Sequence, residues 1–219
     1  MDQTMINQIV GQVIATLSKI SAEDGLEKGI PVGISNRHIH LSAVDCEKLF
    51  GWDHGLTPIK DLKQTGQFAA GETVTLVGKK GVIQGVRVLG PLREVTQIEI
   101  SRTDGFTLGI HPPLRNSGEI AQSAGIVVAG PCGAITLKEG VICANRHIHM
   151  QTDDAKHFGV SDGDRVTVEV DGPRGCIFPK VLVRVHPSFG LEFHIDTDEA
   201  NAIGLKNGDH VRLPQCTGV

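Results

Sequence analysis

The feature that most constrains the fold is a pentapeptide, Asn-Arg-His-Ile-His, which occurs at residues 36–40 and again at residues 145–149. An apolar run precedes each copy, as expected of a strand, and a short helix-like segment follows it. The same order of strand, pentapeptide and short helix, found twice within 219 residues, indicates the duplication of a structural unit.

The two segments after the pentapeptides carry helix start and stop signals. In the first, Ser42 is the expected N-cap, Asp45 follows at the spacing of a capping box, and Gly51 ends the segment. In the second, Thr152 is the expected N-cap and Gly159 the stop. Each pentapeptide is therefore expected at the end of a strand that leads into a short helix.

A second repeat supports the duplication. Residues 155–170 and 200–213 share a short helix, a glycine, a Gly-Asp turn and a strand, and residues 69–78 are a looser relative. Further strand candidates are residues 82–89, 96–101, 125–129, 133–137, 177–185 and 191–195. Many short strands, together with 27 glycines and 10 prolines, favour a mainly β protein with short helices.

We expect two β-barrel domains related by duplication, at about residues 31–140 and 141–219, with strand exchange between them left open. Residues 2–20 place apolar side chains at helical spacing and predict a single amphipathic helix. The polar residues 21–30 would tether it. Its apolar stripe would pack on its own domain, on a second copy of the chain or on a partner.

The histidines of the pentapeptides form candidate metal ligands. Residues i and i+2 of a strand point to the same side, so each His-x-His pair offers two imidazoles on one face. The alternative is hydrogen-bonded histidines left over from the duplication. A further ligand for each pair is offered by a lone carboxylate and a lone histidine in other apolar strands. The candidate ligands are His38, His40, Glu99, His147, His149 and His194.

Three arginines belong to the same regions. Arg37 and Arg146, inside the pentapeptides, point away from the histidines and are expected to pair with carboxylates behind the site. Arg93, six residues before Glu99, suits a phosphate oxygen, with a surface salt bridge as the alternative. The remaining histidines are expected to take no part: His54, His111, His157, His186 and His210.

Composition excludes several classes of protein. The net charge of −4 offers no basic field for nucleic acid. Five scattered cysteines without a Cys-x-x-Cys motif indicate reduced thiols, and no apolar run reaches transmembrane length, so we expect a soluble intracellular protein that binds no membrane. The fingerprints of P-loop nucleotide hydrolases, dinucleotide-binding folds and α/β-hydrolases are absent.

Three longer segments carry a family resemblance: PVGISNRHIHLS, GPLREVTQIEISRTDGFTLGIHPPLRNSGEI, and the series ANRHIHM, GVSDGDRVTVEV and FHIDTDEANAIGL. They resemble the phosphate propanoyltransferases of propanediol utilisation, from about Pro31 to the end of the chain. The resemblance implies the reversible conversion of acyl-CoA and phosphate to acyl phosphate and CoA. It also implies two β-barrels with a two-zinc site between them, although other divalent transition metals would fit.

The resemblance implies roles for single residues. His38, His40 and Glu99 would hold one metal ion, and His147, His149 and His194 the other. Arg93 would bind the phosphate as the catalytic residue. The residues implied to contact CoA are Ser35, Lys60, Arg87, Leu89, His194 and Asn201.

The resemblance also bears on partners and location. In members of the family that work in bacterial microcompartments, a short amphipathic N-terminal helix directs the enzyme into the shell, and residues 2–20 resemble such a peptide. It implies a bacterial cytoplasmic enzyme in the microcompartment lumen. Shell proteins would be its partners, and we expect a homo-oligomer.

Two other functions stay open at this point. A two-domain cupin, which would be a metal-dependent oxygenase or isomerase, would use Asp45 and Asp154. Each follows the second histidine of its pentapeptide by five residues. Helix capping explains these aspartates more simply. A non-catalytic zinc-stapled scaffold would close each metal with four protein ligands, whereas only three can be named for each, which favours open catalytic sites.

Overall fold

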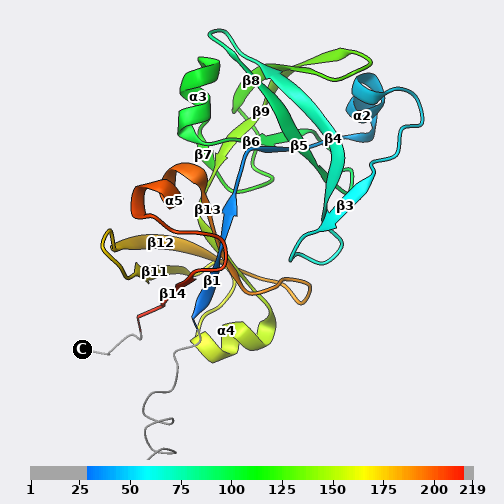
Figure 1. Cartoon of the computed structure of the whole chain (residues 1–219). Coiled ribbons are helices and arrows are strands. Elements are labelled where there is room, and N and C mark those ends of the chain that lie inside the picture. Colours follow the sequence, from blue (N-terminus) through cyan, green and yellow to red (C-terminus); the bar gives the residue numbers. More distant parts are fainter. Residues whose placement is uncertain (1–28, 215–219) are drawn as a thin grey trace, which may run out of the picture.

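The structure is a computed structural model that describes residues 29–214 of the chain. The expected helix at residues 2–20 and most of its tether lie outside the described residues. The described chain is mainly β, with four short helices, and forms two barrels stacked one above the other (Figure 1). The fold class expected from the sequence is confirmed.

The first barrel is built on an eight-stranded sheet. Its strands are β2 (His38–His40), β3 (Pro58–Asp61), β4 (Phe68–Val77), β5 (Val82–Gly90), β6 (Gln97–Glu99), β7 (Leu114–Arg115), β8 (Ala124–Ala129) and β9 (Ala134–Ala144). They follow the order β3-β4-β5-β2-β6-β9-β7. Strand β8 pairs with both β4 and β9, which closes a ring of six strands around an apolar core.

The second barrel has six strands. They are β1 (Ile30–Ser35), β10 (His147–Met150), β11 (Arg165–Val170), β12 (Cys176–Val185), β13 (Glu192–Asp196) and β14 (His210–Val211), in the order β11-β12-β10-β13-β1-β14. Glu169 and Arg212 exchange backbone hydrogen bonds of 2.8 and 3.0 Å and close the ring between β11 and β14. This barrel has an apolar core of its own.

The two rings have the same plan. In each, the pentapeptide strand (β2 or β10) lies between a parallel neighbour (β5 or β12) and an antiparallel one (β6 or β13). The next strand in the ring, parallel again, is β9 in the first barrel and β1 in the second. Each of these strands leads directly into the pentapeptide strand of the opposite barrel.

The chain therefore crosses between the barrels at both pentapeptides, and Figure 1 shows the blue segment doing so at β1. The expected domain division at residue 140 stays a prediction, because it was drawn along the sequence and the sheets do not divide the chain at a single residue. By sheet membership β1 belongs with the strands of the C-terminal half.

A short helix follows each of the strands β2, β6, β10 and β13. The helices are α2 (Ala43–Phe50), α3 (Arg102–Leu108), α4 (Thr152–Phe158) and α5 (Thr197–Ile203). Helices α2 and α4 end at Gly51 and Gly159, as expected. Among residues 29–214 no helix is both long and apolar enough to span a bilayer.

The helix starts differ in detail from the expectation. Ser42 does cap α2, because its hydroxyl accepts from the backbone N–H of Asp45. Thr96 replaces the reciprocal half of the capping box: its hydroxyl accepts from Ser42 N and donates to Asp45 at 2.7 Å. The expectation for Thr152 is wrong, since Gln151 is the N-cap without a side-chain bond and Thr152 is the first helical residue.

Some elements were missed from the sequence. Helix α3 was not expected, although Ser101 and Asp104 form a complete capping box at its start. Strand β3 is exposed along its whole length and begins with Pro58, so it shows no apolar alternation. Strand β9 runs well past the expected residues 133–137, because the polar Lys-Glu-Gly at 138–140 interrupts its apolar pattern without ending the strand.

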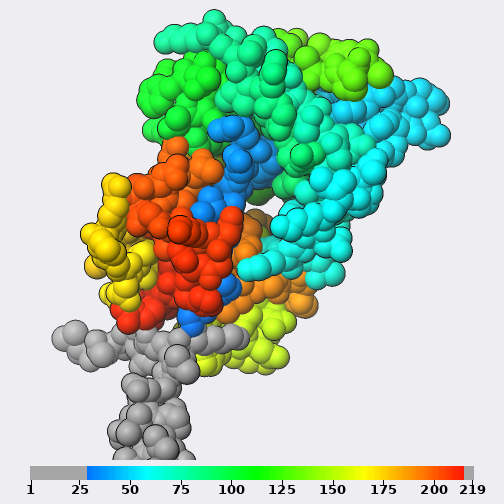
Figure 2. Space-filling model, in the orientation of Figure 1, coloured from blue at the N-terminus to red at the C-terminus, as the bar shows by residue number. Residues whose placement is uncertain are grey.

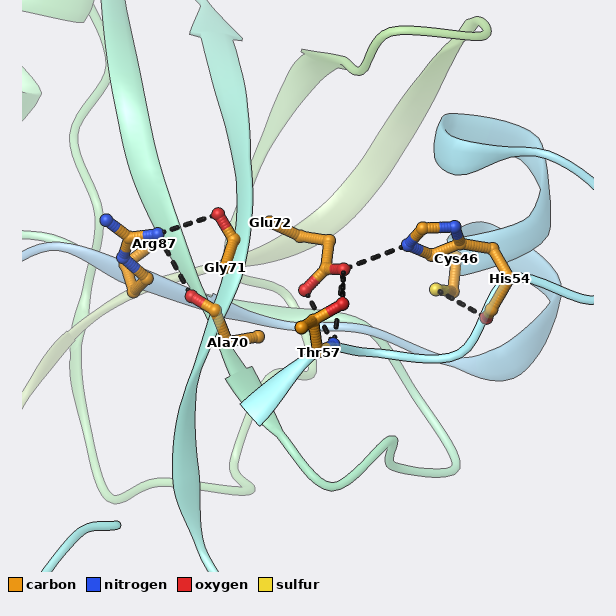
Figure 3. A network of polar contacts seen from close by, with 7 residues as sticks. All are labelled: Cys46, His54, Thr57, Ala70, Gly71, Glu72 and Arg87. Carbon is orange, nitrogen blue, oxygen red and sulfur yellow. Dashed lines mark hydrogen bonds and ion pairs between the residues drawn. The ribbon is translucent and has the colours of Figure 1, made fainter. Parts of the chain in front are cut away.

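A polar network fixes the start of β3 on β4 (Figure 3). The carboxylate of Glu72, on β4, accepts from the backbone N–H and hydroxyl of Thr57 and lies 3.0 Å from Nε2 of His54. The ring of His54 stacks on Phe50 of α2. Because Thr57 immediately precedes β3, this network sets where β3 enters the junction.

We expect the Glu72→Gln substitution to lower the free energy of unfolding by about 1–3 kcal/mol, because an amide has one accepting oxygen where the carboxylate has two. Burial acts against ionisation of Glu72, but the hydrogen bonds from Thr57 and His54 outweigh it and lower its pKa. The contribution is therefore present above the pKa of an unfolded glutamate and is lost as the pH falls through the lower folded-state value. Urea unfolding at pH 7 and pH 4 tests this: a difference between wild type and variant that does not shrink at pH 4 would contradict it.

Candidate active site

A cavity of about 880 Å³ lies at the junction of the barrels. In Figure 2 a hollow opens there, between the cyan part of the first barrel and the orange and red part of the second. All six candidate ligands and Arg93 line the cavity. The two crossovers explain this, because each pentapeptide leaves one barrel and enters the other at the cavity wall.

The first cluster consists of His38, His40 and Glu99, whose ligand atoms all lie within 4.8 Å of one another. His38 and His40 project from the same face of β2. Glu99 lies on β6 directly opposite His38 in the antiparallel ladder, with its carboxylate 3.6 Å from Nε2 of His38. Strand register thus supplies the third member of the cluster.

The second cluster repeats this arrangement with His147, His149 and His194, again within 4.8 Å. His194 on β13 is directly opposite His147 on β10. It occupies the place that Glu99 has in the first barrel. The carboxylate of Glu192 lies 2.6 Å from Nε2 of His194.

Hydrogen bonds orient the imidazoles. Nδ1 of His38 lies 2.9 Å from the carbonyl oxygen of Asn36, and Nδ1 of His147 lies 2.8 Å from that of Asn145. When Nδ1 carries the proton and donates it in a hydrogen bond to the carbonyl, Nε2 keeps a free electron pair. This is the arrangement of most metal-bound histidines.

Two buried ring nitrogens, Nδ1 of His40 and Nε2 of His149, have no hydrogen-bond partner among the described residues. Buried polar atoms are rarely left unpaired. One unpaired nitrogen in each cluster is therefore consistent with a metal-binding site, and the donor sets of two histidines with a carboxylate and of three histidines suit zinc.

The protonation states fit the same use. Burial, reinforced by the neighbouring histidines and arginines, lowers the pKa of His40 to about 3, of His147 to about 4 and of His149 to about 2, and for His40 and His147 it outweighs the opposite effect of Glu99. Burial opposes ionisation of Glu99, but His38 and a hydrogen bond with Ser117 outweigh it, so its pKa is also lowered. Neutral imidazoles and an ionised carboxylate are the forms that bind metal ions.

The arginines of the pentapeptides pair with carboxylates, as expected, although Arg37 also lines the cavity. Arg37 pairs with Asp104 through contacts of 2.7 and 2.9 Å, and Arg146 pairs with Glu199 at 2.9 Å. Both carboxylates belong to capping boxes, on α3 and α5. Each pentapeptide is thus held from behind by the helix that follows its antiparallel neighbour.

Comparison with known proteins matches this chain to one family. A family model described as phosphate propanoyltransferase matches residues 31–206. A phosphate propanoyltransferase of Thermotoga maritima is 58% identical over 170 residues, covering 77% of this chain and 81% of that protein. Those of Rhodobacter capsulatus and Salmonella typhimurium are 52% and 50% identical, and each alignment covers 88–89% of both chains.

The chain belongs to the phosphate propanoyltransferase family.

Membership confirms that the protein is an enzyme of the phosphate acyltransferase class. It favours this activity over the cupin-like and scaffold alternatives. Asp45, on which the cupin alternative relied, accepts a hydrogen bond from Thr96 at the start of α2, and neither Asp45 nor Asp154 belongs to a ligand cluster.

Of the residues that the family resemblance implied for CoA, five line the cavity: Ser35, Lys60, Arg87, Leu89 and His194. Nη1 of Arg87 donates to the backbone oxygens of Ala70 and Gly71, both at 2.9 Å, so part of this guanidinium is committed to β4 (Figure 3). Asn201 lies exposed on α5 and is not among the lining residues.

The loop between β3 and β4 brings two residues to the cavity that sequence reasoning missed. The buried side chain of Gln64 lies against Nδ1 of His149 and 3.4 Å from Nε2 of His194. Nζ of Lys63 pairs with Glu192 at 2.6 Å. A loop of the first barrel thus covers the histidine cluster of the second barrel in this transferase. No sequence motif in the loop predicts this contact.

A buried amide also supports the first cluster. Nε2 of Gln97 donates to Glu99 at 2.7 Å and to Ser117 at 2.9 Å, and its oxygen accepts from the backbone N–H of Gly118 at 2.7 Å. A polar residue in the apolar strand β6, two positions before Glu99 and on the same face, was the signal that could have found it.

Proposed function

We propose that this member of the family transfers a short-chain acyl group reversibly between CoA and inorganic phosphate in the cavity between the barrels. The observation that carries the proposal is the convergence of two three-ligand clusters and Arg93 on one cavity. The names of the relatives make propanoyl-CoA the first substrate to test and acetyl-CoA the second.

In the proposed reaction a phosphate oxygen forms a bond to the thioester carbonyl carbon, the carbon–sulfur bond breaks, and CoA leaves as the thiolate. Two metal ions, zinc or another divalent ion, would be held by His38, His40 and Glu99 and by His147, His149 and His194, and when bound they supply Lewis-acid polarisation of the carbonyl and compensation of the phosphate charge. Phosphate is already ionised at neutral pH, so the reaction needs no strong general base.

The protein's own residues then position the reactants. Arg93 is half-buried in the cavity wall, where its guanidinium can bind two phosphate oxygens at once. Ser35, Lys60, Arg87 and Leu89 line the part of the cavity that we assign to CoA. Holding both reactants in a walled cavity makes the attack effectively intramolecular.

One experiment tests this function directly. Metal per chain is measured on the purified protein by elemental analysis, and free thiol release is followed from propanoyl-CoA and acetyl-CoA with and without phosphate. About two metal ions per chain and phosphate-dependent release support the proposal. Release without phosphate would make the protein a thioesterase, and bound metal without release would return the cupin-like enzyme or the scaffold to consideration.

We expect Gln97→Met to weaken metal binding at the first cluster by about 10- to 100-fold, because second-sphere hydrogen bonds fix the orientation of a metal ligand. Competition with a chromogenic chelator measures the affinity. Gln84→Met, at an exposed position on β5, is the matched control. Equal affinities in the Gln97 variant and the wild type would contradict the role.

We also propose that residues 2–20 direct the enzyme into a microcompartment. Support comes from the apolar stripe in the sequence alone. Deleting residues 1–20 is expected to leave turnover largely intact and to abolish co-purification with shell proteins. A truncated protein that unfolds would instead assign the segment to the fold.

A further inference from the structure

A fourth arginine lines the cavity together with Arg37, Arg87 and Arg93. It is Arg184 on β12, which sequence reasoning did not single out. Arg184 pairs in register with His149 across the parallel ladder between β12 and β10. Because residues in register point to the same face of a sheet, its side chain leaves the strand beside the second histidine cluster.

Arg93 has a related position in the first barrel. Its backbone N–H donates to the carbonyl oxygen of Leu41 at 2.8 Å, and it forms a parallel bridge with Ser42, just beyond the end of β2. Each arginine thus comes from the segment that runs parallel to a His-Ile-His strand. Arg93 comes from the first barrel and Arg184 from the second, at different registers, because Arg184 lies opposite His149 and Arg93 lies opposite Ser42.

The two guanidinium groups also share a lack of partners. Neither Arg93 nor Arg184 forms an ion pair with another residue of the described part of the chain, whereas Arg37, Arg146 and Arg212 all do. Arg184 lies over the ring of Phe189 at 5.9 Å, and the same ring packs against His149 at 4.3 Å. This contact holds the side chain in place and uses none of its N–H donors.

Two cations in one cavity repel each other. The pKa of Arg93 is lowered, first by burial and further by the charge of Arg184, while Glu99 acts in the opposite direction. Metal ions on the clusters would add to this positive charge. An anion bound between the guanidinium groups would relieve it, and a phosphate offers enough oxygens for both.

We propose that Arg184 is a second phosphate-binding residue, so that inorganic phosphate and the phosphoryl group of the acyl phosphate are held between Arg93 from one barrel and Arg184 from the other. This inference rests on the proposed function. It gives Arg184 the role of orienting the nucleophile, since two guanidinium groups on different walls fix the phosphate against rotation as well as translation.

The test compares Arg184→Ala and Arg184→Lys with wild type, and uses Arg165→Ala as the matched control. Arg165 is exposed on β11, outside the cavity, and its guanidinium makes one long contact with a backbone oxygen. The constants measured are KM for phosphate, KM for propanoyl-CoA and the affinity of the metal-loaded protein for inorganic phosphate by calorimetry. Metal per chain is determined for every variant.

We expect Arg184→Ala to raise KM and Kd for phosphate by about 10- to 100-fold, the range for losing hydrogen bonds between charged groups. KM for propanoyl-CoA should stay within about twofold. Arg184→Lys should fall between alanine and wild type, because a lysine keeps the charge but not the fork of donors. Arg165→Ala should match wild type.

Three results would overturn the proposal. Unchanged phosphate binding in both Arg184 variants is one. A raised KM for propanoyl-CoA that disappears with the dephospho-CoA thioester would assign Arg184 to a phosphate of CoA. Loss of metal from the lysine variant would show that Arg184 positions His149 for metal binding and does not bind phosphate. Calorimetry needs no turnover, so phosphate binding that depends on Arg184 stands apart from any failure of the proposed activity.

Discussion

Replacing His147 with alanine is expected to remove about one metal ion per chain and to reduce acyl transfer at least 100-fold. The magnitude follows because even second-sphere changes at metal sites cost about 10- to 100-fold, and His147 would supply one of only three ligands. His38→Ala should have the same effect at the other cluster. Elemental analysis and thiol release on the same samples measure both quantities.

His157→Ala is the matched control for this prediction, because His157 is an exposed histidine on α4 in the same half of the chain. It should keep its metal and its activity. Full activity in either cluster variant would contradict the two-metal mechanism. Loss of both metal ions from a single substitution would show instead that the clusters bind metal cooperatively.

Replacing Arg93 with alanine is expected to lower kcat/KM for phosphate by about 100- to 1,000-fold, the usual cost of removing a preorganised donor from a site of developing charge. Metal content should not change, because Arg93 belongs to neither cluster. Arg93→Lys should recover part of the loss. Steady-state kinetics with phosphate as the varied substrate gives the constants.

Arg102→Ala is the control for Arg93, since Arg102 is exposed on α3 and outside the cavity. Wild-type kinetics in the Arg93 variant would contradict its role. A rise in KM for propanoyl-CoA without any effect on phosphate would move Arg93 to the CoA side of the cavity.

The ligand clusters could be predicted from the sequence because their geometry is local. A strand places His38 beside His40, and His147 beside His149, whatever surrounds them. Glu99 and His194 were identifiable as single polar residues in apolar strands. Their positions directly opposite His38 and His147 depend on register, which the structure supplies.

Residues that reach the cavity from elsewhere in the chain could not be predicted. Gln64 and Lys63 sit in a polar loop with no periodicity, and they approach the second cluster only because the barrels are stacked. Arg184 resembles any charged residue on the outer face of a strand until the ladder with β10 is known. Asn201 was placed by resemblance alone, and α5 carries it outside the cavity.

The crossovers at the pentapeptides have a consequence for how the chain can be divided. Strand β1 completes the second barrel and β9 completes the first, so a cut between β8 and β9, at residues 130–133, would leave each fragment with a strand that fits only the other. Separate fragments should therefore be insoluble alone and regain activity when refolded together. Each such fragment combines a crossing strand with most of one barrel. Two identical copies of one fragment could therefore exchange their crossing strands and close both barrels only as an intertwined dimer.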